Sequence, residues 1–199
     1  MPVRPRPPFV TWTGVAYRAI SYDVPLWVNP NRREGRWNIA GSGCTQYMSL
    51  DPMAPMAEML RHEDLRTEAE ASHYRTTLWQ IRVDEGCVVD YSTFEKADAA
   101  GFPAEALVAD DHERCQAEAQ WLIGCGARAL LAPCAALTGN VNLAIFGPRV
   151  KIPWDSQTRL ASTLPVQRLS TGSAQPGLVG QVRFFGEPHS GLAAYRKAS

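Results

Sequence analysis

The alternation of apolar and polar residues first indicates short β-strands. Residues 76–84 read TTLWQIRVD and place Trp79, Ile81 and Val83 on one face, which is the period of two expected of a half-buried strand. Residues 15–21 alternate in the same way, so Tyr17 and Arg18 point to opposite faces. The other predicted strands are 44–50, 87–91, 127–133, 140–146, 150–154, 165–169 and 177–185.

Two segments have the signals of helices. Asp51 and Pro52 resemble a helix start, because aspartate can cap free amides and proline at the first helical position gives up no needed donor. The first helix should then run through Glu58 to about Arg66. The second should span 111–124. Its apolar residues at helical spacing are Cys115, Ala119, Leu122 and Ile123.

These elements predict a mixed α+β fold, with short-stranded sheets and two or three helices. The 199 residues suit one core. Proline-rich residues 1–14 are interpreted as an extended N-terminal arm. A single domain is expected over 15–199, with its core at 15–150 and C-terminal strands and a tail at 151–199.

Composition and charge narrow the class of protein. Hydrophobic residues make up 45% and charged residues 20%, as in a globular protein. Basic and acidic residues number 20 each, so direct binding of nucleic acid is not expected. The sequence has no signal-peptide pattern and no run of the ~20 apolar residues that span a bilayer. We therefore expect a cytoplasmic protein without membrane contact.

The cysteines predict neither a disulfide framework nor a metal site. They are five in number and lack paired short spacings, which favours a reducing compartment. His112 and Cys115 share a helix face, but two ligands do not make a metal site. A cysteine hydrolase with Cys134 as nucleophile and His112 as base is one alternative, and it requires the two side chains to meet in space.

Candidate chemistry gathers in residues 35–62, GRWNIAGSGCTQYMSLDPMAPMAEMLRH. Arg36, like Arg18, offers a planar charged fork that suits phosphate, although a surface ion pair is the ordinary alternative. Glu58 lies among methionines and other apolar residues. A partly buried carboxylate there has a partner or a function, unless it pairs with Arg61 or His62 on the helix surface.

Several motifs occur in an order that resembles the RES-domain family, toxins of bacterial toxin–antitoxin pairs. They are YRA at 17–19, GRWN at 35–38, QYMSL at 46–50 with Glu58 a helix later, APCA at 132–135 and GNVNL at 139–143. The resemblance covers about residues 15–150. The family has serine in a Pro-Ser-Ala motif where this chain has Cys134, and a thiol is larger and a weaker hydrogen-bond donor than a hydroxyl.

The resemblance implies a fold like that of ADP-ribosyltransferase toxins, with NAD as co-substrate and no metal. On this basis Arg18 and Arg36 would hold the pyrophosphate, and Glu58 would stabilise the cationic ribose. Tyr47 would stack on the nicotinamide or ribose, with Tyr17 as a possible second wall. The supporting residues would be Cys134, which orients Glu58 or the ribose, and Asn142, which supports that loop.

The favoured function is a toxin that cleaves NAD and transfers ADP-ribose to a protein acceptor. The alternatives are an NAD glycohydrolase or phosphorolase that depletes NAD, and an inactive binding protein of the same fold. The resemblance also implies a cognate antitoxin that blocks the active site and often carries a DNA-binding helix-turn-helix. Exposed edge strands near the C-terminus make a homodimer plausible. Residues 70–77 and the tail after Trp154 are candidate surfaces for docking the acceptor.

Overall fold

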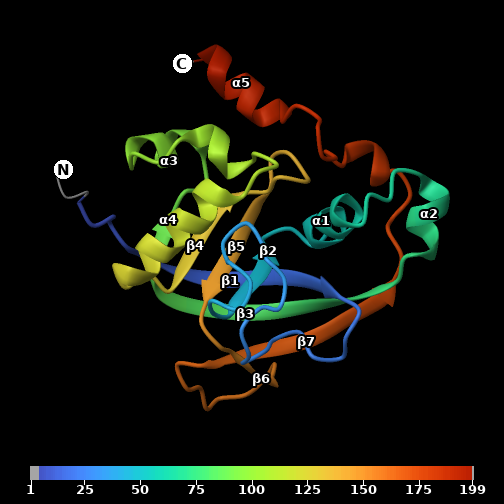
Figure 1. Ribbon diagram of the computed structural model, residues 1–199. Helices are drawn as coiled ribbons and strands as arrows, with labels where there is room; N and C mark the ends of the chain where they lie inside the picture. The colour runs from blue at the N-terminus through green and yellow to red at the C-terminus, as the bar shows by residue number, and fades with distance from the viewer. Residues whose placement is uncertain (1–4, 199) are drawn as a thin grey trace.

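The computed structural model describes residues 5–198 (Figure 1). In chain order the elements are β1 (Val10–Ile20), β2 (Thr45–Ser49), α1 (Ala54–His62), α2 (Glu68–His73), β3 (Thr76–Asp90), α3 (Phe94–Ala99), η1 (Ala104–Leu107), α4 (Glu113–Gly124), β4 (Ala129–Pro133), β5 (Val141–Phe146), β6 (Val150–Pro153), β7 (Thr163–Gly172), η2 (Val179–Gln181) and α5 (Ser190–Ala198). The predicted mixed α+β class is confirmed.

The strands form one sheet in the order β1-β2-β5-β4-β3-β7-β6, and β1 also pairs with β3. The first five strands of that order therefore close into a ring. β3 makes this possible because its 15 residues have room for several partners. One edge of β3 pairs with β1, while the other pairs with β7 over 76–81 and with β4 over 88–90. The sheet therefore branches along β3, because β7 pairs with its first residues and β4 with its last.

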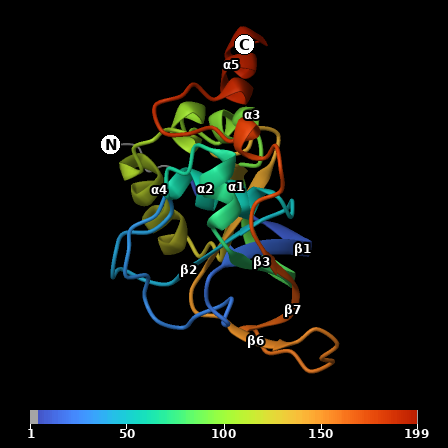
Figure 2. The ribbon, with the colours of Figure 1, turned by 90° about the vertical axis from the view of Figure 1, so that its right-hand side faces the viewer.

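The two faces of this sheet are buried against different partners. Ile81, Val83 and Leu143 belong to the core cluster on the inner face of the ring. Outside it, Leu107 and Leu122 pack with strand residues such as Leu130. In Figures 1 and 2 the helices lie on one side of the sheet, and β6 and β7 extend from the other end. A third cluster joins α1 to the loop after β4 and to residues 178–184.

Several predicted boundaries are wrong. Residues 10–14, assigned to the N-terminal arm, form the first part of β1 and pair with β3, while residues 1–4 lie outside the described part of the chain. The predicted strands 76–84 and 87–91 are one strand, β3. Cys87 adopts a positive φ of 53° within it, where the register with β1 shifts between Val10 and Trp12, as at a β-bulge.

The predicted helix from Asp51 to about Arg66 is shorter. Asp51 accepts a hydrogen bond from the amide of Met53, and α1 begins only at Ala54. The helix ends at His62, and Thr67 then caps a separate helix, α2, in a capping box with Glu70. Residues 68–73 therefore follow their own local signal and do not continue the first helix.

Helix number and the C-terminal region also differ from expectation. Residues 5–198 contain five α-helices where two or three were predicted. The predicted strand 177–185 contains η2 and irregular backbone instead. Its apolar residues Val182 and Phe184 pack in the cluster beside α1, so their alternation reflects burial without strand pairing. Ile123, one of the apolar residues at helical spacing in the predicted second helix, is 48% exposed.

One buried ion pair at the closed ring gives a test of stability. Glu85 of β3 binds Arg149 at 2.7 Å and Arg128 at 2.6 Å. The side chain of Arg149 is 5% exposed, whereas that of Arg128 is 44% exposed. Arg149→Met should lower the free energy of unfolding by about 3 kcal/mol, because it leaves a buried carboxylate with only its exposed partner.

The measurement is urea denaturation followed by circular dichroism, with Arg128→Met as the matched control. The control removes the exposed partner of the same carboxylate and should cost less than about 1 kcal/mol. Equal losses in the two variants would show that burial does not set the strength of this pair.

Candidate active site

Glu58 is held by two donors, Cys134 in the loop after β4 and Asn142 in β5. Its Oε1 accepts a hydrogen bond from Asn142 Nδ2 at 2.8 Å and from Cys134 Sγ at 3.1 Å. Ala54, one turn before Glu58 on α1, and Ala57 pack in the same core cluster as Cys134, so the half-buried Glu58 side chain lies near the side of α1 that faces Cys134. The predicted surface pairing of Glu58 with Arg61 or His62 is not formed. The hydrogen bonds from Asn142 and Cys134 both use Oε1, which sets the orientation of the carboxylate.

Strand pairing fixes the direction of the Asn142 amide. Ser49 of β2 lies opposite Asn142 of β5 in the antiparallel register. The Ser49 hydroxyl donates to Asn142 Oδ1 at 2.6 Å, so the Nδ2 group of that amide is directed to Glu58. The serine of the QYMSL motif therefore acts on the site through a cross-strand neighbour.

Cys134 is a buried, protonated donor. Its thiol donates to Glu58 and accepts a hydrogen bond from the amide of Leu137 at 3.3 Å. Burial raises the pKa of the Cys134 thiol well above its usual value, and the negative charge of Glu58 adds to the effect. The thiol thus makes the contact with the carboxylate that a serine hydroxyl would make.

This environment argues against the cysteine-hydrolase alternative. A nucleophilic cysteine needs a thiolate and an adjacent base, whereas the Cys134 thiol is bonded to a carboxylate. Within residues 5–198 no imidazole bonds to this sulfur. The contact of His189 Nε2, at 3.2 Å, is with the backbone oxygen of Cys134.

Tyr47 holds the loop that carries Arg36. Its hydroxyl accepts a hydrogen bond from the amide of Trp37 at 2.8 Å and donates to Asn38 Oδ1 at 2.9 Å. A Cβ atom at Gly35 would lie 2.7 Å from the tyrosine hydroxyl, so only glycine fits this approach. Burial raises the pKa of Tyr47, which keeps the hydroxyl protonated as a donor.

Arg36 is half-buried and donates to the backbone oxygen of Ala106 at 3.3 Å. The neighbouring His112 responds to its charge: burial, together with the positive charges of Arg36 and Arg61, lowers the pKa of His112 to about 4. A neutral imidazole therefore lies in a region of positive potential. Trp37 is buried and packs near Phe102 in the core.

Tyr17 and Arg18 lie on opposite faces of β1. Tyr17 pairs with Ser49, so it shares the face of Glu58. Arg18 points to the inner face, where Nη1 donates to Gln46 Oε1 at 3.2 Å and the guanidinium lies 3.8 Å from the centroid of the Trp27 ring. Burial lowers the pKa of Arg18 to about 9. Within residues 5–198 Arg18 has no hydrogen bond to another candidate residue, and Tyr47 is the candidate that acts on it electrostatically.

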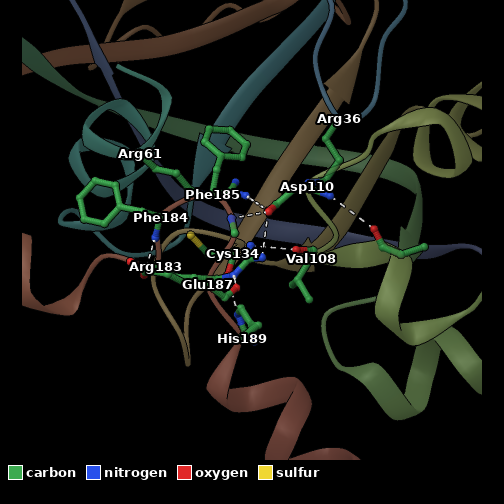
Figure 3. Close-up of polar contacts among 12 residues, drawn as sticks. Arg36, Arg61, Val108, Asp110, Cys134, Arg183, Phe184, Phe185, Glu187 and His189 are labelled. Atoms are coloured by element: carbon green, nitrogen blue, oxygen red, sulfur yellow. Dashed lines mark hydrogen bonds and ion pairs between the residues drawn. The ribbon is translucent and has the colours of Figure 1, made fainter. Parts of the chain in front are cut away.

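Sequence reasoning missed a charged cluster beside Glu58. Arg61, one turn along α1, is 3% exposed and binds Asp110 Oδ1 at 2.6 Å. Arg183 binds the same oxygen at 2.9 Å, and Figure 3 shows these side chains grouped around Asp110. The spacing of three residues between Glu58 and Arg61 was a signal for a shared helix face, whereas Asp110 and Arg183 carried none.

Residues 5–198 contain neither a group of side chains placed to bind a metal ion nor a membrane-spanning helix. Within residues 5–198 no group of three or more His, Cys, Asp or Glu side chains is placed to hold a metal ion. None of the helices in this part of the chain has the length and apolar character needed to cross a membrane.

Comparison with known proteins gives one family and one fold. A family model described as the RES domain matches residues 10–163. A chain of the crystal structure of the M. tuberculosis MbcT–MbcA toxin–antitoxin complex superposes with a TM-score of 0.63 at 22% identity, covering 88% of this chain and 91% of that chain. At that identity the likeness shows a shared fold. No curated protein matches the chain significantly.

The Tyr47 contacts predict how the loop depends on one hydroxyl. Tyr47→Phe leaves the amide of Trp37 and the Asn38 oxygen without their partner, so it should lower the free energy of unfolding by about 1–3 kcal/mol. Hydrogen exchange at the Trp37 amide should accelerate. Tyr22→Phe is the control, because Tyr22 is 72% exposed. Unchanged exchange at Trp37 would show that the hydroxyl does not hold this loop.

Proposed function

The chain belongs to the RES-domain family, and from that premise we propose that it is a toxin that cleaves NAD at the nicotinamide–ribose bond and transfers ADP-ribose to a protein acceptor. The observation that supports this most directly is Glu58, a half-buried carboxylate fixed on one oxygen by Asn142 and Cys134. Such a group is suited to stabilise a positive charge that develops beside it.

Glu58 would act on the ribose. Cleavage of the nicotinamide–ribose bond leaves a carbon with oxocarbenium character. With Oε1 bound to two donors, we assign Oε2 to the ribose hydroxyls and the cationic carbon. A carboxylate already held in place needs little reorganisation as the charge develops.

Arg36 would bind the pyrophosphate. It forms no ion pair among the described residues, and although it contacts the Ala106 carbonyl and the Cys115 thiol, the five N–H donors of a guanidinium leave others for contact with phosphate. Arg36 and Arg61 both act as positive charges on His112, and positive charge at this place suits a dianionic group. We do not retain Arg18 in this role, because its guanidinium is buried on the inner face.

Tyr17 and Tyr47 were both predicted to contact the nicotinamide or ribose, and we assign them different roles. Tyr17 lies on the face of Ser49 and Glu58, and we assign it the wall against the nicotinamide or ribose. Tyr47 contributes chiefly through its hydroxyl, which holds the loop of Arg36.

A cognate antitoxin is the proposed partner. The solved neighbour with this fold was crystallised as a toxin–antitoxin complex, which supports a partner that blocks the site here. The cytoplasmic location, the homodimer and the helix-turn-helix of the antitoxin stay predictions from the sequence. The inactive-protein alternative is less favoured, because Cys134 still donates to Glu58.

The proposal predicts the effect of neutralising one carboxylate. Glu58→Gln keeps a hydrogen-bond acceptor for Asn142 but removes the negative charge, so nicotinamide release from NAD should fall by about 10²–10³-fold. The assay uses NAD labelled on the adenylate, with and without cell lysate, and follows free nicotinamide and labelled protein bands. Glu63→Gln, an exposed residue just after α1, should match the wild type.

The products separate the remaining alternatives. A discrete labelled band identifies a transferase, free ADP-ribose identifies a glycohydrolase, and a phosphorylated ADP-ribose formed only in phosphate buffer identifies a phosphorolase. NAD binding without nicotinamide release would identify the inactive binding protein. If Glu58→Gln cleaved NAD as fast as the wild type, the assignment of Glu58 would be wrong.

The hydrogen bond from Cys134 to Glu58 predicts how substitutions of Cys134 change nicotinamide release. Cys134→Ser should keep nicotinamide release within about threefold of wild type, because a hydroxyl makes the same contact with Glu58. Cys134→Ala should lower it by roughly tenfold or more, since a hydrogen bond to a charged group contributes about 1.5–3 kcal/mol. Initial rates of nicotinamide release measure both. Full activity in Cys134→Ala would remove this residue from the site.

A further inference from the structure

A C-terminal segment outside the family match reaches the candidate site. The match ends at residue 163, yet residues 183–189, here called the C-terminal clasp, contact the loop that contains Cys134. The amide of Arg183 donates to the backbone oxygen of Ala136 at 2.8 Å. His189 is buried, and its Nε2 contacts the backbone oxygen of Cys134 at 3.2 Å.

Asp110 joins this clasp to the helix of Glu58. Its Oδ1 accepts from both Arg61 and Arg183, and its Oδ2 accepts from the amide of Gly186 at 2.7 Å. Arg183 also donates to the backbone oxygen of Val108 at 2.9 Å. One carboxylate therefore connects α1, the segment before α4 and the clasp, as Figure 3 shows.

Arg61 is the member of this cluster nearest in sequence to Glu58. Its guanidinium lies 4.0 Å from the centroid of the Phe185 ring, so the clasp covers it. Its Nε is buried without a hydrogen-bond partner in the described structure. A buried charge with an unsatisfied donor tolerates little further loss of contacts. The orientation of Arg61, and with it this turn of α1, therefore depends on Asp110 and the clasp.

We propose that the C-terminal clasp is part of the working active site, with Arg183 and Arg61 as positioning residues that hold Glu58 in its productive orientation. This inference rests on the proposed function. The clasp reaches Glu58 by two routes: through Asp110 and Arg61 to α1, and through the backbone of the Cys134 loop to the thiol that donates to Glu58. Displacing a catalytic group by about 1 Å can reduce a rate on the order of 10²-fold.

The first test is kinetic and compares Arg183, which belongs to the clasp, with Arg66, which contacts the clasp from the connection between α1 and α2. Arg183→Met should lower kcat for NAD cleavage by about 10–100-fold and change KM by less than about threefold, because it disturbs a group that acts in the transition state. Arg66 also contacts the clasp, at Glu187 and the Phe185 carbonyl, but its side chain is 45% exposed. Arg66→Met should keep kcat within about twofold.

Two further variants separate positioning from a general loss of structure. In a Glu58→Gln background, Arg183→Met should cause no further loss of activity, because both changes remove the same contribution. Arg183→Lys keeps a charge for Asp110 but loses the fork that also reaches Val108, so its kcat should lie between wild type and Arg183→Met. Equal losses in Arg66→Met and Arg183→Met, or additive losses with Glu58→Gln, would overturn the inference.

A readout independent of NAD distinguishes this inference from the proposed function. Cys134 and Cys115 are both fully buried, so their alkylation rates, resolved by peptide mass, report local opening. Arg183→Met or Arg183→Lys should accelerate labelling of Cys134 severalfold and leave Cys115 unchanged. Unchanged labelling of Cys134 in these variants would refute the proposal that the clasp holds the Cys134 loop. If the wild type did not release nicotinamide, the proposed function would fail, and this labelling alone would decide whether the clasp holds the Cys134 loop.

Discussion

The pairing of β1 with both β2 and β3 is the constraint on which the site depends. It closes five strands into a ring and gives every strand residue an inner or an outer side. Tyr17 and Ser49 are then outside, on the face where Ser49 orients Asn142 toward Glu58, whereas the residue after Tyr17, Arg18, is inside and stacks on Trp27. Successive side chains of a strand point to opposite faces, so one side chain cannot change faces without a shift of the whole register.

The outer face of the ring also supplies the groups that stabilise the half-buried carboxylate of Glu58. Glu58 is placed where Cys134, in the loop after β4, and Asn142 of β5 both donate to one of its oxygens. One donor is aligned by Ser49 from the neighbouring strand, and the other is a thiol that burial keeps protonated. Hydrogen bonds to a charged group offset the cost of its desolvation, so the site is prepared before any substrate arrives.

Positive charge around this carboxylate comes from three separate parts of the chain. Arg36 lies on a loop held by Tyr47, Arg61 lies on α1, and Arg183 lies in the clasp beyond the RES-domain match. Asp110 balances two of these arginines, which allows them to approach one another. The proposed pyrophosphate contact at Arg36 and the proposed positioning role of Arg61 are therefore parts of one electrostatic arrangement.

The sequence by itself determined the α+β class, the buried alternation of β3, the partly buried state of Glu58 and the order of the RES-domain motifs, because these depend on local periodicity and residue type. Tertiary structure decided which motif residues meet. Arg18 was separated from Glu58 by ring closure, and Arg61 was buried by contacts from Asp110 and Phe185, far away in the chain. The apolar residues of 177–185 packed beside α1 without forming a strand. A single sequence contains the local preferences, whereas long-range pairing and the burial of charge decide how they are used.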